Sequence, residues 1–331
     1  MLATDQTSDS QNIPVIGRHA VSSLFYDKAA MESLFRLACQ CESLALSCDA
    51  RFSGLLSGKT VATVFFENST RTRVSFELAA KSLGATHVHL SADGSSVKKG
   101  ETLEDTLETL LALGVSGLVM RHPESGSALK AATYVGDRAS VLNGGDGVND
   151  HPSQGLLDGL TLYRHFNGDL AGRKIAIVGD ALHSRVIRSN LMLLNQWGVD
   201  VHVCGPETLL PKDFEALGCQ VHHQLEPALE QADAVMGLRI QHERQDAGLI
   251  DSLESYHQAY GLTTARLETY AKPNAPVLHP GPMNRGVEIS DELADGPRSL
   301  IRKQVAHGLL IRQALFIECL IPEKKPEILS W

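Results

Sequence analysis

The sequence has few aromatic residues and lacks the features of membrane, fibrous, disordered and disulfide-stabilised proteins. Aromatic residues make up 5% of the 331 positions, so any core must rest on Leu, Val, Ile and Ala. No apolar run approaches the roughly 18 residues of a membrane span. The start, MLATDQTSDSQN, has neither the positive charge nor the apolar stretch of a signal peptide. The six cysteines form no CxxC pair and no zinc-type spacing, so we expect a cytoplasmic protein with reduced thiols.

Nucleotide-binding signatures are also missing. KIAIVGD (174–180) looks like a first dinucleotide-binding strand, but a single glycine, Gly179, stands where G-x-G-x-x-G is needed for the backbone to approach a pyrophosphate. No Walker A lysine loop occurs. A net charge of −9 argues against nucleic acid or an acidic membrane as partner. An NAD-linked dehydrogenase and a P-loop enzyme are therefore not favoured.

The hydrophobic patterning alternates between strand and helix along the whole chain. Short apolar runs predict strands at 60–66, 86–90, 117–121, 174–179, 199–205, 232–239 and 275–280. Helical periodicity predicts helices at 29–46, 70–84, 102–113 and 185–197, and one long amphipathic helix at 299–320 with apolar residues at 301, 305, 309 and at 306, 310, 314. This order is typical of parallel sheets with helical crossovers.

We therefore predict an α/β protein with two doubly wound domains, each a parallel sheet flanked by helices, joined by interdomain helices. The expected boundaries are 1–150 for the first domain, with 1–20 a loose arm, and 151–297 for the second. Residues 298–331 are expected to form a C-terminal helix that packs back on the first domain.

Polar and basic residues follow the predicted strands, at the edge where open parallel sheets bind ligands. They are 67–73, Arg121, His122, 150–154, His183, Arg185, Arg239, Gln241 and 279–282. Ser69 and Thr70 lie at a helix start, where free N–H groups and the helix dipole favour an anion, and Arg71 adds a bidentate grip. The alternative is a plain N-cap with surface arginines. These residues indicate a site for an anionic small molecule.

Histidine offers a second kind of chemistry at the domain junction. His151, in DHPSQ, is placed to donate a hydrogen bond to a carbonyl oxygen and polarise it for attack. The pairs His87–His89 and His222–His223 have no Cys, Asp or Glu at metal-ligand spacing, so metal binding there is not favoured.

Seven segments in order carry a family resemblance that spans most of the chain from about residue 59 to the C-terminal helix. They are FFENSTRTRVSFE, SSVKKGETLEDT, VMRHPESG, NDHPSQGLLD, VGDALHSRV, LRIQHER and LHPGPMNRGVEI. Together they resemble the carbamoyltransferase family, whose members transfer the carbamoyl group of carbamoyl phosphate to an amino acid, and within it the enzymes that act on aspartate.

The resemblance implies a role for each matching residue. The phosphate would be bound by Ser69, Thr70, Arg71 and Thr72, and the carbamoyl end by Arg121, His151, Gln154 and the backbone carbonyls of Gly281 and Pro282. The carboxylates of L-aspartate would be bound by Arg185 and Arg239, assisted by Gln241. Ser95 and Lys99 would reach the site of a neighbouring subunit, which implies a homotrimer with shared sites. The catalytic set would be Arg71, Thr72, Arg121, His151 and Lys99. No cofactor or metal is expected.

The acceptor is the main alternative within this family. Ornithine carries an ammonium that needs an acidic partner, whereas the second domain offers arginines and has HPGP (279–282) where ornithine enzymes have His-Cys-Leu-Pro, so we expect aspartate. Ser153 replaces the usual threonine. Gly281 and MNRGVEI resemble a bacterial subgroup that associates with a dihydroorotase-like chain, which is therefore a possible partner. A non-catalytic anion-binding relative is a further alternative.

Overall fold

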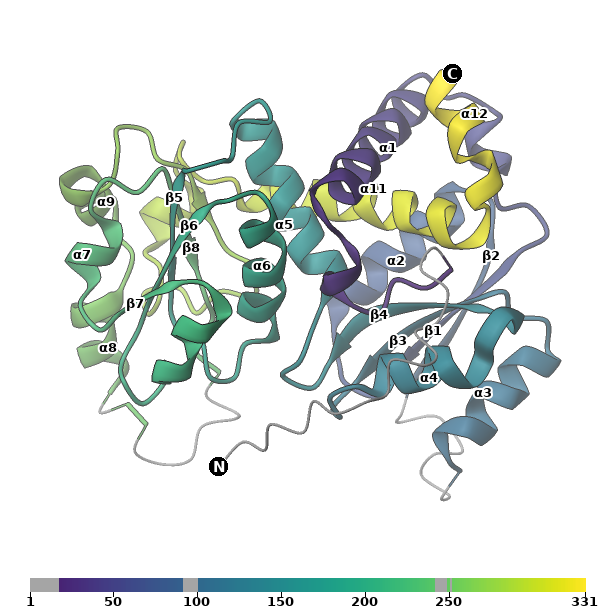
Figure 1. The fold of residues 1–331 in the computed structure, drawn as a ribbon, viewed down its shortest axis with the longest axis horizontal. Coiled ribbons are helices and arrows are strands. Elements are labelled where there is room, and N and C mark those ends of the chain that lie inside the picture. The colour runs from purple at the N-terminus through teal and green to yellow at the C-terminus, as the bar shows by residue number, and fades with distance from the viewer. Residues whose placement is uncertain (1–17, 92–100, 242–248, 251) are drawn as a thin grey trace.

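The computed structural model describes residues 18–91, 101–241, 249–250 and 252–331, which form two α/β lobes side by side (Figure 1). All strand pairs within the two sheets are parallel. The first sheet has the order β2-β1-β3-β4, with β1 Thr60–Phe65, β2 Thr86–Ser91, β3 Gly117–His122 and β4 Ser140–Asp146. The second has the order β7-β6-β5-β8-β9, with β5 Lys174–Val178, β6 Asp200–Cys204, β7 Gln220–His222, β8 Ala234–Gly237 and β9 Val277–Leu278. The expected fold class is confirmed.

Helices cover both faces of each sheet. On the first sheet, α3 (Leu103–Ala112) and α4 (Ser127–Val135) lie on one face, and α1 (Lys28–Leu46), α2 (Thr70–Ser82) and α11 (Ile301–Leu320) lie on the other. On the second sheet, α5 (Pro152–His165) and α6 (Arg185–Gln196) lie on the side of the first lobe, opposite α7 (Leu225–Leu229) and α9 (Thr264–Tyr270). Shorter elements are α8 (Leu253–Tyr260), α10 (Asp291–Asp295), α12 (Lys325–Ser330), η1 (Ser23–Phe25), η2 (Phe52–Gly54), η5 (Gly136–Arg138), η6 (Lys212–Leu217) and η8 (Pro322–Lys324).

The central strands are unbroken apolar runs because both of their faces are covered. Val61 to Phe65 in β1 and Ile175 to Val178 in β5 are buried at every position. One continuous cluster of buried side chains contains residues of α1, α2, α5, α6 and α11. The two lobes therefore share a core at their junction.

The C-terminal helix α11 has its predicted position, but the prediction that it is amphipathic is wrong. Every residue from Leu310 to Ile317 is buried, while Val305, expected on the apolar face, is 57% exposed. The helix lies among α1, α2 and α5. Its polar residues find partners there, since Arg312 donates to Ser75 Oγ at 2.7 Å and Gln313 to Ser82 Oγ at 2.7 Å.

Strand prediction fails at β4, at the short β7 and at the end of β9. β4 was not expected, because its sequence SVLNGGD carries an Asn-Gly-Gly turn signal. It needs Gly144, where a Cβ would lie 3.1 Å from the Phe65 ring. β7 was not expected either. The last strand, expected to stop at Pro280, ends at Leu278, since proline cannot donate to a sheet.

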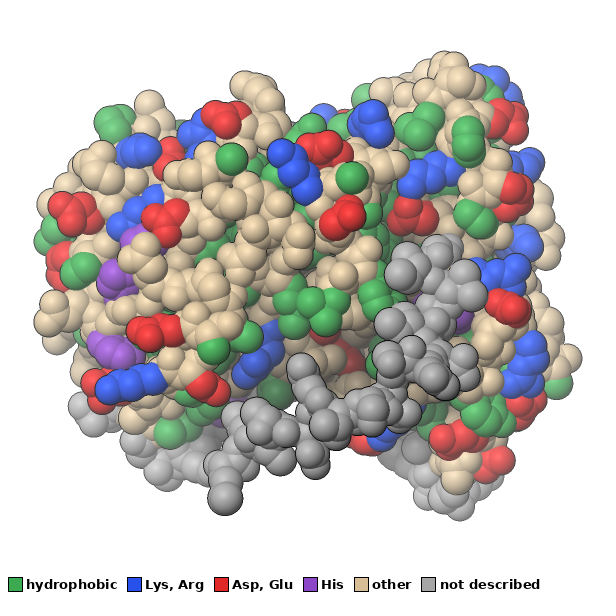
Figure 2. All heavy atoms as spheres, in the orientation of Figure 1, with side chains coloured by type: hydrophobic (Ala, Val, Ile, Leu, Met, Phe, Trp, Pro, Cys, Tyr) green, Lys and Arg blue, Asp and Glu red, His purple; other side chains and the backbone are tan. Residues whose placement is uncertain are grey.

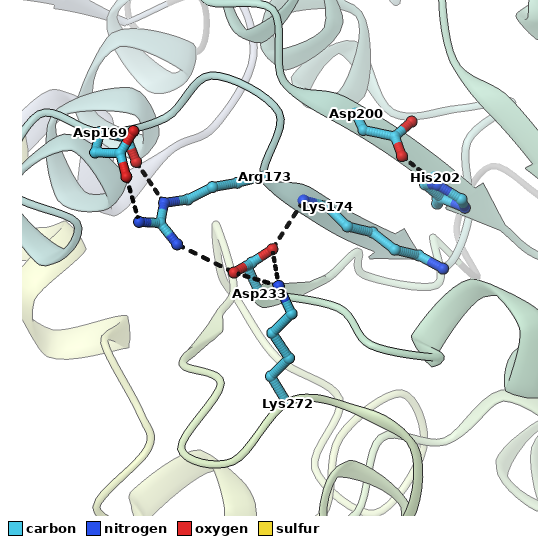
Figure 3. Close-up of polar contacts among 7 residues, drawn as sticks. All are labelled: Asp169, Arg173, Lys174, Asp200, His202, Asp233 and Lys272. Atoms are coloured by element: carbon cyan, nitrogen blue, oxygen red, sulfur yellow. Dashed lines mark hydrogen bonds and ion pairs between the residues drawn. The ribbon is translucent and has the colours of Figure 1, made fainter.

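An ion-pair network holds the amino edge of the second sheet (Figure 3). Asp233, directly before β8, accepts hydrogen bonds from the Lys174 backbone at 3.0 Å, Arg173 at 3.1 Å and the Lys272 ammonium at 3.0 Å. Burial acts to raise the pKa of Asp233, but the bonds from Lys272 and Lys174 outweigh it and hold the pKa below its usual value. This edge is thereby fixed, while the opposite, carboxyl edge is left for the residues described next.

The surface seen in Figure 2 has acidic and basic side chains interspersed over both lobes. In the described part of the chain, no single helix is long and apolar enough to span a bilayer. A bent pair, Ile301–Leu320 with Pro322–Ser330 at 109°, meets the criteria of length and composition.

Candidate active site

A cavity of about 1110 Å³ lies between the lobes, at the carboxyl ends of the strands. It brings together every site residue predicted from the sequence that the structure describes: Ser69, Thr70, Arg71, Thr72, Arg121, His151, Gln154, Arg185, Arg239, Gln241, Gly281 and Pro282. The two remaining predicted residues, Ser95 and Lys99, lie outside the described residues. The two histidine pairs do not line this cavity, and their rings contact other side chains: Thr63 Oγ1 lies 3.2 Å from His87 and 2.9 Å from His89, and His222 lies 2.8 Å from His202.

The start of α2 forms one end of the cavity. Ser69 is the N-cap residue, in extended conformation with φ −157°, and its side chain makes no capping bond. The first backbone N–H groups of the helix are thus available to an anion, with the helix dipole behind them. The turn 279–282 lies against Arg71, because a Cβ on Gly281 would be 3.0 Å from the guanidinium carbon. Gly281 has φ +66°, a conformation that favours glycine.

His151 lies deep in the cavity wall, at the start of α5. Its Nε2 is 3.4 Å from Thr72 Oγ1 and its Nδ1 is 3.5 Å from Ser153 Oγ. Its backbone N–H donates to Ser189 Oγ on α6 at 2.8 Å. Burial, and then the charges of Arg121 and other arginines, hold the pKa of His151 well below its usual value. The ring is therefore a neutral imidazole that can donate a hydrogen bond to a developing oxyanion.

Glu67 joins the lobes across the cavity, and sequence reasoning gave it no role. Its Oε2 accepts a bond from Arg185 Nη2 at 2.6 Å and lies 3.4 Å from Arg121 Nε. Arg121 also donates to the Gly144 carbonyl at 3.2 Å. The signal was present, since Glu67 follows β1 directly, but an acidic residue is unexpected in an anion site. Here it orients arginines from both lobes.

The second lobe positions Gln241 through a buried carboxylate. Both carboxylate oxygens of Asp180, which lies two residues after β5, are 3.0 Å from His183 Nδ1. Asp180 also accepts a hydrogen bond from the Gln241 backbone N–H at 3.4 Å. Gln241 Nε2 donates to the His183 carbonyl at 2.9 Å. Arg239 lines the same wall. These contacts place an amide and arginines opposite the start of α2.

Two lining residues from α11, Gln304 and Arg312, were also missed. Both are buried, and burial lowers the pKa of Arg312 to about 10, although the charge of Asp158 opposes this. The signal available in the sequence was the presence of polar residues at 304 and 312 in an otherwise apolar helix. That pattern indicates buried polar contacts, but not their partners.

Comparisons with known proteins identify the family. The model described as aspartate/ornithine carbamoyltransferase, carbamoyl-P binding domain, matches residues 18–164. The model described as aspartate/ornithine carbamoyltransferase, Asp/Orn binding domain, matches residues 171–319. Among curated proteins, the aspartate carbamoyltransferase catalytic subunit of Desulforamulus reducens is 54% identical over 78% of this chain and 82% of its own. That of Corynebacterium urealyticum is 51% identical over 80% of this chain and 84% of its own.

Solved structures agree with these relatives. Aspartate transcarbamoylase from Trypanosoma cruzi in complex with carbamoyl phosphate and aspartate has a TM-score of 0.81 and 30% identity, and covers 92% of this chain and 97% of that one. Its complex with N-(phosphonacetyl)-L-aspartic acid has a TM-score of 0.81 and 31% identity, with 92% and 96% covered. The chain described here therefore belongs to the aspartate/ornithine carbamoyltransferase family, and its relatives within it are aspartate carbamoyltransferase catalytic subunits.

Proposed function

We propose that this protein transfers the carbamoyl group of carbamoyl phosphate to the α-amine of L-aspartate. The products are N-carbamoyl-L-aspartate and phosphate, and the reaction is an early step of de novo pyrimidine (UMP) biosynthesis. The observation that carries the proposal is a single cavity with cationic groups at two ends: the start of α2 with Arg71 on one lobe, and Arg185 with Arg239 on the other. This arrangement fits a phosphate at one end and a dicarboxylate at the other.

Catalysis rests on position and fixed charge. The unprotonated amine attacks the carbamoyl carbon, a C–N bond forms, and the carbonyl oxygen becomes an oxyanion. Arg121, His151 and Thr72, which line one wall, stabilise this oxyanion until the C–O bond to phosphate breaks and phosphate leaves with the electron pair. The attacking nitrogen loses one proton, which the departing phosphate accepts. Ser69, Thr70 and Arg71 hold the phosphate throughout, and Gln154 with the carbonyls of Gly281 and Pro282 holds the carbamoyl NH₂. Such a mechanism is mainly positioning plus electrostatics.

Aspartate is favoured over ornithine by the charge of the second lobe. Arg185, Arg239 and Gln241 line the acceptor end and offer donors to carboxylates. Glu67 is engaged by Arg185, which leaves it poorly placed to receive an ornithine ammonium.

The proposal extends to assembly. Ser95 and Lys99, from the segment 91–100 of a neighbouring copy, would complete the site, so the active unit would be a homotrimer. A dihydroorotase-like chain is a candidate partner in a larger complex. The six cysteines are all unpaired, which supports a reducing, cytoplasmic setting.

The test is ureido-product formation by the purified chain with carbamoyl phosphate and either aspartate or ornithine. We expect product with aspartate alone. Product with ornithine would contradict the assignment of the arginines. Absence of product with both acceptors, in a sample that light scattering shows to be trimeric and with a dihydroorotase-like chain added, would refute the proposed activity. Arg239→Met serves as a variant that should raise the KM for aspartate and leave binding of carbamoyl phosphate unchanged.

A further inference from the structure

Asp158 is a buried carboxylate behind the cavity wall, on α5, and the reaction does not use it directly. Its side chain is fully buried. Three side-chain amides donate to it: Gln154 Nε2 to Oδ1 at 3.0 Å, Gln304 Nε2 to Oδ1 at 2.7 Å and Asn190 Nδ2 to Oδ2 at 3.0 Å. These amides come from α5, α11 and α6, so one carboxylate connects three elements that border the cavity.

An ionised carboxylate can only accept hydrogen bonds, and this fixes which way each amide points. Burial raises the pKa of Asp158 to about 6, while the three amides and the charge of Arg312 act to lower it. The group is therefore ionised at neutral pH. Gln154 must present its NH₂ to Asp158, which leaves its carbonyl oxygen as the end that faces away, and Gln154 lines the cavity. The ligand accordingly meets an acceptor at this position.

The same carboxylate fixes the turn on the other side of the carbamoyl position. Gln304, held by Asp158 through Nε2, accepts the His279 backbone N–H on Oε1 at 2.9 Å. His279 Nδ1 accepts the Gly281 N–H at 2.9 Å. A chain of hydrogen bonds thus runs from Asp158 to the turn 279–282, which lines the cavity and carries the carbonyls of Gly281 and Pro282 proposed to hold the carbamoyl NH₂. If Gln304 were reversed, its NH₂ would face the His279 N–H and the chain would break.

We propose that Asp158 is a positioning residue that sets the polarity of this end of the cavity, so that acceptors alone surround the NH₂ group of the carbamoyl donor. The inference rests on the proposed function. It predicts a specific discrimination, because carbamoyl phosphate and acetyl phosphate have the same shape and differ in NH₂ against CH₃. The two N–H groups of the former are shared among the three acceptors, whereas the latter leaves all three unpaired. Inorganic phosphate, which has no such group, is indifferent to Asp158.

The experiment measures dissociation constants of carbamoyl phosphate, acetyl phosphate and inorganic phosphate by calorimetry on the purified protein. Asp158→Ala should weaken carbamoyl phosphate by about tenfold, which corresponds to the loss of one to two hydrogen bonds, and leave phosphate and acetyl phosphate within about twofold. A role confined to stability would lower the melting temperature and either leave the three dissociation constants unchanged or weaken all three ligands together. Either binding result would overturn the proposal.

Two further variants test which atoms of Asp158 carry the effect. Asp158→Asn should restore most of the discrimination. Its oxygen can still accept from both glutamines, and its NH₂ can turn to Asn190, whose Oδ1 is buried without a hydrogen bond within the described residues. Asn190→Ala is the matched control, since it removes the donor to the other carboxylate oxygen and otherwise removes one bond within its own helix, to the Val186 carbonyl. It should leave the ratio of carbamoyl to acetyl phosphate affinity unchanged. A changed ratio would contradict the assignment to Oδ1.

The outcomes separate this inference from the proposed function. A wild-type protein that binds carbamoyl phosphate no better than acetyl phosphate would refute the proposed function itself. A wild-type protein that discriminates, with an Asp158→Ala variant that discriminates equally, would refute only the role of Asp158. If Asp158→Ala does not fold, Gln304→Met decides, because it breaks the connection to the turn alone: lost discrimination supports the proposal, and intact discrimination refutes it.

Discussion

Replacement of His151 tests the oxyanion stabilisation most directly. The ring is buried, lies 3.4 Å from Thr72 Oγ1, and is neutral because burial and nearby arginines hold its pKa well below the usual value. A neutral donor in a site shielded from water is worth roughly 10²–10³ in rate when it is removed. His151→Ala should therefore lower kcat by roughly 10²–10³, and change the KM for carbamoyl phosphate much less, because we propose that the phosphate binds at the start of α2.

The assay is steady-state product formation across a pH series, with thermal melts as a control for folding. His151→Asn keeps a donor near the same place and should recover part of kcat. Since its lowered pKa leaves His151 uncharged at neutral pH and above, the Asn variant should keep the wild-type pH profile of kcat in that range. A loss below about fivefold in His151→Ala, against the expected value, would refute the role. The role would also be refuted if the wild-type pH profile of kcat had an inflection near neutral pH that is lost in His151→Asn.

Three further predictions concern neighbouring groups. Glu67→Gln should raise the KM for aspartate by about tenfold, because a charge-assisted bond of 2.6 Å that orients an arginine of the acceptor end is lost; an unchanged KM would contradict this. Burial raises the pKa of Asp158 from 3.8 to about 6, so the folded state loses stability as the pH rises through this range. Between about pH 5 and 8, the free energy of unfolding of the wild type should fall by about 1.4 kcal/mol more than that of Asp158→Asn. If the two free energies change equally with pH, the pKa of Asp158 is not raised. Gly281→Ala should weaken phosphate binding at least tenfold (about 1.4 kcal/mol), because its Cβ would lie 3.0 Å from the Arg71 guanidinium carbon. Gly286→Ala is the matched control, since Gly286 has a similar φ and a Cβ there would have no atom within 4 Å. Equal effects of the two substitutions on phosphate binding would refute the role of the contact with Arg71.

The fold could be predicted where local sequence and tertiary environment agree. β1 and β5 are apolar runs of strand length, and burial on both faces of a parallel sheet is what such runs require. Prediction failed where packing overrides local preference. Gly155 lowers the helix propensity of α5, yet α5 and α6 approach so closely there that a Cβ would lie 2.7 Å from Leu193. Such proximity is a property of two elements, and neither carries it in its own sequence.

The site residues divide in the same way, into those whose grouping follows from the sequence and those whose position depends on tertiary packing. Arg121, Arg185 and Arg239 could be grouped because parallel topology brings strand ends to one edge. Gln304 could not, because it reaches the cavity from a helix near the C-terminus, after a chain reversal that no local pattern records. The bond between Glu67 and Arg185 also required the structure, since it depends on how one lobe faces the other.

That bond raises the question of how Arg185 can hold Glu67 and still serve an acceptor. Its Nη2 donates to Glu67, while Nη1 is buried and, within the described residues, makes no hydrogen bond. A guanidinium has donors on two edges, so one can remain with Glu67 as the other receives a carboxylate. A buried donor without a partner is costly, and a dicarboxylate that reaches it relieves this cost, whereas an acceptor with an ammonium would not. The proposed binding of a carboxylate by Arg185 thus requires no loss of the bridge to Glu67, and the unpaired Nη1 favours a carboxylate over an ammonium.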